Sequence, residues 1–115
     1  MKNNELPIYK DCYEMCKFTL QYIKNFPRNY RYTIGNDLHK LNIEMLKGIM
    51  KANNTRDKKE RRENIEGIIL GMEEYQINVR LCLDLKLLSV KQYSRLVELI
   101  NSILSQSKGW KRSTF

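Results

Sequence analysis

Apolar residues recur at helical spacing in four segments of the chain, separated by short breaks. The first segment opens near Pro7 and stops before Pro27. Its expected core positions are three or four residues apart: Tyr9, Tyr13, Cys16, Leu20 and Ile23. Residues at this spacing share one face of a helix. Proline suits a first helical turn, but it pushes the residue before it out of helical geometry, so both ends of this helix are marked.

The second and third segments follow the same rule. The second begins around Thr33 and ends near Asn54, with these expected core positions: Ile34, Leu38, Leu41, Met45 and Ile49. The third follows Thr55 with a nearly all-charged stretch and then a long apolar stripe: Ile65, Ile68, Met72, Tyr75, Val79 and Cys82. A fourth helix starts at Ser89, which can form a capping box with Gln92, and its pattern stops at Ser105.

Residues 77–87 also alternate between apolar and mostly polar side chains, which is a strand pattern. A lone strand among helices would leave its backbone groups without partners, so we expect a helix here. On that helix a second apolar stripe forms beside the first: Ile77, Leu81, Leu85 and Leu88. A helix that is apolar on two faces is buried on two sides, and we expect the second side to be a subunit interface.

Four helices with short connections predict an all-α, up-down-up-down bundle over residues 1–106, followed by a basic tail at residues 107–115. The chain carries no apolar leader at its start and no run of about 18 apolar residues, so we expect a cytoplasmic protein without a membrane span. Three cysteines form no disulfide framework; they are either buried, inert thiols or part of a metal or redox site.

The net charge is +8, from 21 basic and 13 acidic residues, and the basic residues cluster. Such a charge is typical of proteins that bind a polyanion, because lysine and arginine neutralise phosphates while aromatic rings stack on unpaired bases. The candidate nucleic-acid-binding residues come from three clusters: Arg28 and Arg31; Lys58, Lys59, Arg61 and Arg62; and Lys108, Lys111 and Arg112. The alternatives are solvated charges and aromatics, Tyr30, Tyr32 and Trp110, that close the bundle ends. RNA and DNA are both open as ligands.

Little in the chain suggests catalysis. The one histidine, His39, lies in the middle of the second helix, and Glu73 and Glu74 are adjacent and point to different helix faces. The chain has no phosphate-binding glycine loop, no nucleophile elbow and no Glu-x-x-His pair. We therefore expect no enzyme, no metal and no cofactor, and an RNA-processing enzyme is the weakest alternative.

Several segments resemble a known family of small four-helix bundles. They are Ile8-Tyr9-Lys10, the stretch from Phe26 to Gly35, the stretch from Val79 to Ser89, and Gly109-Trp110-Lys111-Arg112-Ser113. The family contains the accessory variability determinant of diversity-generating retroelements and the related proteins encoded in intervening sequences of 23S ribosomal RNA genes. The resemblance implies a pentameric barrel of four-helix bundles with a basic surface. In the retroelement branch it also implies a non-catalytic partner of a reverse transcriptase that binds nucleic acid.

Two alternatives stay open beside the retroelement function: a protein of the ribosomal intervening-sequence branch, and a structural oligomer whose charge only keeps it soluble. A reverse transcriptase would itself be basic. The contact with it should therefore be bridged by RNA or made through acidic patches, for which Glu73, Glu74 and Asp84 are the candidates.

Overall fold

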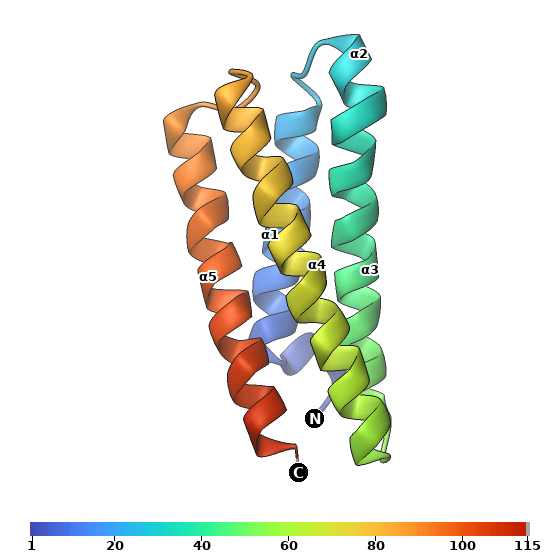
Figure 1. Cartoon of the computed structure of the whole chain (residues 1–115). Helices are drawn as coiled ribbons and strands as arrows, with labels where there is room; N and C mark the ends of the chain where they lie inside the picture. Colours follow the sequence, from blue (N-terminus) through green and yellow to red (C-terminus); the bar gives the residue numbers. More distant parts are fainter. Residues whose placement is uncertain (115) are drawn as a thin grey trace.

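A computed structural model of the chain describes residues 1–114 and shows a bundle of four long antiparallel helices (Figure 1). The long helices are α1 (Pro7–Ile23), α3 (Asn36–Asn54), α4 (Lys58–Asp84) and α5 (Val90–Ser113). Short helical elements precede α1 and α3: η1 (Asn3–Glu5), α2 (Arg28–Tyr30) and the π-helical turn η2 (Arg31–Gly35). The all-helical, four-helix bundle that the sequence predicts is confirmed.

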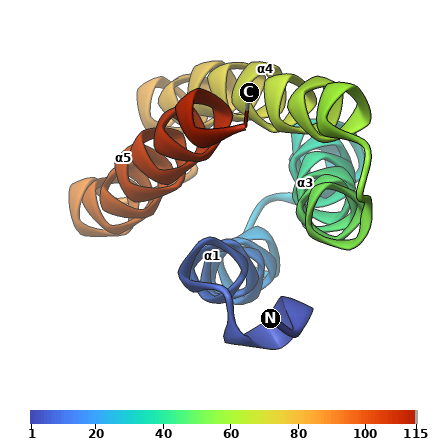
Figure 2. The same ribbon diagram turned by 90° about the horizontal axis from the view of Figure 1, so that it is seen from below.

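Each long helix packs against two neighbours: α1 and α4 both contact α3 and α5. Seen along its axis, the bundle is a four-cornered arrangement with α1 and α4 at opposite corners (Figure 2). It measures 44 × 22 × 22 Å. Both termini and the α3–α4 connection lie at one end, which we call the termini end (Figure 1). The other end, which we call the α2 end, carries the α1–α2 and α4–α5 connections.

The first connection is shorter than the sequence suggested. The sequence predicts that the first helix stops before Pro27 and that the second begins around Thr33. The chain is helical again directly after Pro27, whose carbonyl accepts hydrogen bonds from the backbone N–H groups of Tyr30 (2.9 Å) and Arg31 (3.0 Å). A proline that ends one helix can also open the next, because its missing N–H costs nothing in a first turn. Gly35 lets η2 approach α1 closely, since a Cβ there would lie 2.9 Å from Ile23 Cγ2.

The core stripe predicted for α4 is confirmed at all of its positions: Ile65, Ile68, Met72, Tyr75, Val79 and Cys82 are buried. The stripe predicted for α1 is wrong in its phase, because Tyr13 and Leu20 are about half exposed. Cys16 of the predicted stripe is buried, and Tyr9 and Ile23 are partly buried, but the other buried positions of α1 were not predicted: Ile8, Cys12, Met15 and Thr19. Thr19 can enter the core because its hydroxyl donates to Met15 O (2.6 Å) and shares a hydrogen bond with the Tyr75 hydroxyl.

In α3 the predicted phase is nearly right. Leu38, Met45 and Ile49 are buried, whereas Leu41 is only half buried and its neighbour Asn42 takes the fully buried place.

The second apolar stripe of α4 is partly wrong. The helix ends at Asp84, and the chain then turns through Lys86, whose φ of 60° is left-handed. Leu88 therefore leaves the helix and is buried in the core. Ile77, Leu81 and Leu85 do lie on the surface.

The basic tail that we expected from residue 107 is instead helical as far as Ser113. The segment is polar, so its sequence shows no apolar stripe that would predict a helix. Ser107 is nevertheless buried, and its hydroxyl donates to Ile103 O at 2.7 Å. Trp110 packs against the hydrophobic core. The predicted capping box of Ser89 and Gln92 at the start of α5 is present.

Candidate nucleic-acid interface

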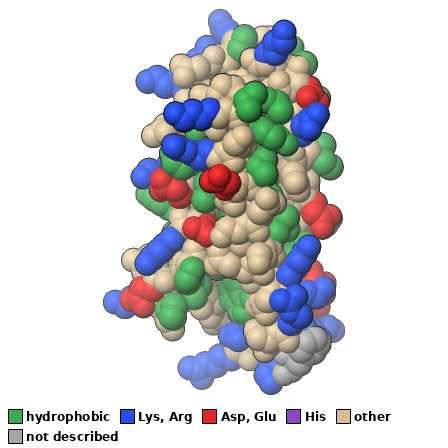
Figure 3. Space-filling model, turned by 90° about the vertical axis from the view of Figure 1, so that its left-hand side faces the viewer, with side chains coloured by type: hydrophobic (Ala, Val, Ile, Leu, Met, Phe, Trp, Pro, Cys, Tyr) green, Lys and Arg blue, Asp and Glu red, His purple; other side chains and the backbone are tan. Residues whose placement is uncertain are grey.

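Charge is distributed unevenly along the bundle. The α2 end, formed by residues 20–40 and 80–95, carries eight lysines and arginines against two aspartates. The termini end, formed by residues 1–6, 50–66 and 105–114, carries ten basic against five acidic residues. The middle of the bundle carries three basic and six acidic residues. On the face in Figure 3, lysines and arginines stand at both ends, and acidic side chains lie mostly between them. Both ends carry an excess of basic residues and attract phosphates, whereas the middle has a net negative charge.

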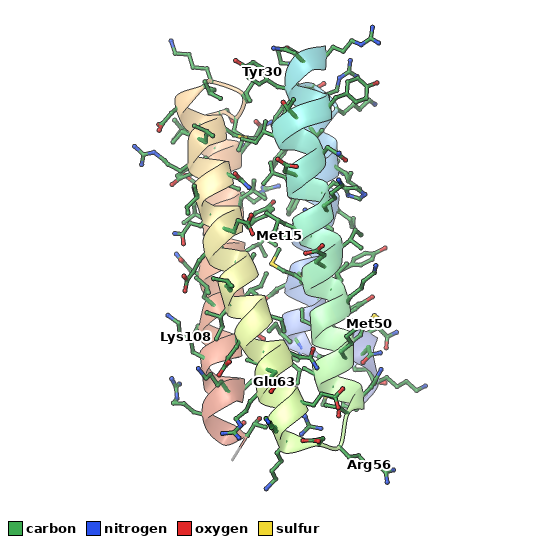
Figure 4. All side chains as sticks on the ribbon, turned by 45° about the vertical axis from the view of Figure 1, so that its right-hand side comes forward. Met15, Tyr30, Met50, Arg56, Glu63 and Lys108 are labelled. Carbon is green, nitrogen blue, oxygen red and sulfur yellow. The ribbon has the colours of Figure 1, made fainter. Side chains whose placement is uncertain are left out.

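Arg28 and Arg31 are exposed on the first helical turns of the α2 end. The guanidinium carbon of Arg28 lies 5.9 Å from the centroid of the Tyr32 ring, and the Tyr32 side chain is 69% exposed. An exposed ring beside an arginine can stack on an unpaired base. Tyr30 is different, because it is half buried and packs against the core, where it closes the bundle end (Figure 4).

Sequence reasoning missed part of this end. Lys24, Lys86 and Lys91 are exposed on the connections and helix start that meet there. None belongs to a run of basic residues, so only the topology, which brings residues 24–31 and 85–91 to one end, could have found them. Arg80 and Arg95 contribute less, because Arg80 pairs with Asp84 at 3.1 Å and the Arg95 guanidinium lies 4.8 Å from the centroid of the Phe18 ring.

At the termini end, Arg61 has a structural role. Its Nε donates to Ala52 O (2.8 Å) and its Nη2 donates to Thr55 O (2.5 Å), at the C-terminal end of α3. Helix C-termini leave carbonyls without partners, and the guanidinium satisfies two backbone carbonyls here. Of the other residues in this cluster, Lys58 and Lys59 are exposed on the first turn of α4, and Arg62 is half buried.

The last turns of α5 lie beside the first half of α4, as the topology predicts. The Lys111 Nζ lies 3.4 Å from Glu66 Oε1, which joins the two helices by an exposed ion pair. Lys108 and Arg112 are exposed. The clusters at Lys58–Arg62 and at residues 108–112 therefore share one end of the bundle, while Trp110 is held by core contacts.

The remaining chemically reactive side chains lie mostly inside the bundle. Cys12, Cys16 and Cys82 are buried free thiols, and burial raises the pKa of Cys82 to about 11. His39 is half buried on α3. Within residues 1–114, no three His, Cys, Asp or Glu side chains are grouped so that they could hold a metal ion. No helix among these residues has both the length and the apolar character that crossing a membrane requires.

Comparison with known proteins identifies the family. No curated protein matches the chain. A family model described as bAvd-like, that is, bacterial accessory variability determinant-like, matches residues 6–114. This match spans all four long helices and agrees with the resemblance carried by the first connection and the end of α5. The chain therefore belongs to the bAvd-like family.

Proposed function

We propose that this chain is an accessory subunit, without an active site of its own, that holds nucleic acid for the reverse transcriptase of a diversity-generating retroelement. The family match over residues 6–114 carries this proposal, since it covers the whole bundle. The uneven distribution of charge supports it, because a basic surface at each end of a rigid bundle suits a polyanion.

Within this proposal the α2 end is the main contact. It has the larger excess of basic residues, and its Tyr32 ring is exposed, whereas Trp110 at the termini end is packed against the core. Arg28, Arg31 and Lys24 neutralise phosphates, and Tyr32 stacks on an unpaired base. Phosphate contacts carry no sequence information, so binding is salt-dependent and nearly independent of sequence, for RNA and DNA alike.

The exposed apolar residues of α4, which are Ile77, Leu81 and Leu85, fit the proposed assembly into a homo-oligomer, with five subunits as the leading number. The contact with the reverse transcriptase is bridged by RNA or made through acidic residues of the middle of the bundle. Of the three candidates, Glu73 and Glu74 are exposed, whereas Asp84 is paired with Arg80.

Co-purification with the reverse transcriptase encoded beside the gene, with and without nuclease, tests the partnership. We expect association that nuclease weakens or abolishes if RNA is the bridge. No association in either arm, or no such gene nearby, would favour the ribosomal intervening-sequence branch.

Fluorescence anisotropy with a labelled single strand tests the binding surface. The variant Lys24→Glu, Arg28→Glu, Arg31→Glu reverses three charges at the α2 end. If all three contact phosphates, the slope of log affinity against log salt falls by about 2, at about 0.7 per phosphate on a single strand.

The matched variant Lys58→Glu, Lys59→Glu, Arg62→Glu reverses three charges at the termini end and spares Arg61. We expect a smaller change in slope than at the α2 end. A larger change would place the binding site at the termini end. If the affinity of the wild-type protein did not depend on salt, the alternative of a structural oligomer without nucleic-acid function would be favoured.

A further inference from the structure

Three polar side chains lie in the core of the bundle, on three different helices. Thr19 of α1 and Tyr75 of α4 are only 1% and 0% exposed, and their hydroxyls share a hydrogen bond. Asn42 of α3 is 0% exposed. Burial raises the pKa of Tyr75, and the Thr19 hydroxyl and the Asn42 amide beside it oppose that rise, so the three groups lie together. We call these three residues the polar layer.

The hydrogen bond in the polar layer crosses the bundle. Helices α1 and α4 lie at opposite corners, and each packs along α3 and α5 (Figure 2). Packing between neighbouring helices therefore fixes the alignment of α1 with α4 only indirectly, through α3 or α5. The bond between Thr19 and Tyr75, which are 56 residues apart, fixes that alignment directly.

Stability alone does not explain why Asn42 is in the core. Its amide approaches the Tyr75 hydroxyl, yet neither the nitrogen nor the oxygen of the amide completes a hydrogen bond with any group in residues 1–114. A buried polar group without hydrogen bonds lowers the free energy of unfolding, and an apolar side chain of similar shape avoids that cost. Single buried polar residues can, however, fix the register of packed helices at a cost in stability.

The layer next to these residues is made of methionines. Met15, Met45 and Met72 are buried, and each lies three or four residues from a member of the polar layer, towards the termini end. Figure 4 shows Met15 in the interior of the bundle. Methionine is flexible and fills gaps of many shapes, so this layer specifies the alignment of the helices poorly.

We propose that the polar layer is a register lock, which selects one axial alignment of α1, α3 and α4 over alignments shifted by one helical turn. The core stripe of α4 is apolar on both sides of Tyr75, so a shifted alignment keeps most apolar contacts. In that alignment Thr19 lies level with Met72 or Val79, and the Tyr75 hydroxyl is buried without its partner. The cost of that unpaired hydroxyl disfavours the shift.

The register lock also holds the α2 end in place. Lys24 directly follows α1, and Lys86 lies two residues after the end of α4. A shift of one turn, about 5.4 Å, would move these two lysines relative to each other. The inference concerns the fold of a single chain, so it does not depend on the proposed function.

Methyl NMR on the full chain tests the register lock, because the three core methionines lie beside the polar layer. In the wild-type protein Met15, Met45 and Met72 should each give one methyl resonance. The variant Asn42→Leu keeps the branched shape of the side chain and removes the amide. We expect it to raise the urea midpoint by about 1 M and to give additional methionine resonances, because shifted alignments become populated.

A second variant, Tyr75→Phe, removes only the hydroxyl that crosses the bundle and adds no volume. Thr19 keeps its hydrogen bond to Met15 O (2.6 Å), so no new polar group is left unpaired. This variant should also give additional methionine resonances, and it tests the lock even if Asn42→Leu does not fold. The control Ile49→Leu exchanges one buried apolar residue of α3 for another and should keep one resonance for each core methionine.

A folded Asn42→Leu or Tyr75→Phe variant with a single resonance for each core methionine would overturn the register lock. A lower urea midpoint of folded Asn42→Leu would also overturn it, because the amide would then stabilise the fold. Additional resonances in Ile49→Leu would do the same, since any repacking of the core would then disturb the alignment.

Discussion

We predict that Arg61 stabilises the fold, whereas its neighbour Lys59 contributes to nucleic-acid binding. The change Arg61→Met keeps most of the aliphatic stem and removes the two donors to Ala52 O (2.8 Å) and Thr55 O (2.5 Å). A hydrogen bond from a charged group contributes about 1.5–3 kcal/mol, and an unsatisfied buried carbonyl costs about 1–3 kcal/mol. Arg61 is only half buried, so water can replace part of the loss. We expect the free energy of unfolding to fall by about 1–3 kcal/mol.

Urea unfolding followed by circular dichroism measures this loss, and Lys59→Met is the matched control. Lys59 is exposed and lies on the same turn of α4, so its replacement should change the free energy of unfolding by less than about 0.5 kcal/mol. In fluorescence anisotropy with a labelled single strand, Lys59→Met should reduce the salt slope of binding, whereas Arg61→Met should leave it unchanged. Equal stabilities of the two variants, with a larger loss of nucleic-acid binding for Arg61→Met, would refute the structural role.

Three further outcomes are expected from urea unfolding. Met72→Ala should lower the free energy of unfolding by about 2–5 kcal/mol because Met72 is fully buried, whereas Leu41→Ala should cost less because Leu41 is half buried. Gly67→Ala should raise it by about 1 kcal/mol, because Gly67 lies inside α4 and an added Cβ would meet no atom within 4 Å. Burial raises the pKa of Cys82 from 9.0 to about 11, so the folded state favours the neutral thiol. The stabilisation from this thiol should be fully present below pH 9 and should be lost as the pH rises towards 11. The variant Cys82→Ala should not show this loss.

The helices could be predicted from the sequence, but their phase could be predicted only in part. In α4 one dense stripe outlines the buried face, and every predicted position is buried. In α1 apolar residues cover more than one face, so the neighbouring helices decide which face is buried. Thr19 and Asn42 are polar yet buried, and a rule based on hydrophobicity places both outside the core. For Thr19, the partner that permits burial is Tyr75, 56 residues away in the chain.

The candidate interface shows the same division between local and non-local information. Runs of basic residues are visible in the sequence, and Arg28 and Arg31 are indeed exposed. The role of Arg61 depends on Ala52, nine residues earlier, whose carbonyl lies near the C-terminal end of α3. Lys86 and Lys91 belong to the α2 end because two connections meet there. A residue-by-residue assignment of such a surface therefore requires the topology.

The proposed homo-oligomer, through the exposed residues of α4, and the proposed binding surface at the α2 end use different parts of the bundle, and this gives the charge pattern a consistent physical meaning. Like charges repel, so side-by-side packing of molecules with a net charge of +8 needs an acidic region between the basic ends. The glutamates of α4 supply that region in the middle of the bundle, so the two basic ends lie outside the contact between copies. Aligned copies would then gather their α2 ends on one rim. Each added copy multiplies the charge that a single nucleic-acid strand meets, and the strand can contact several subunits at once.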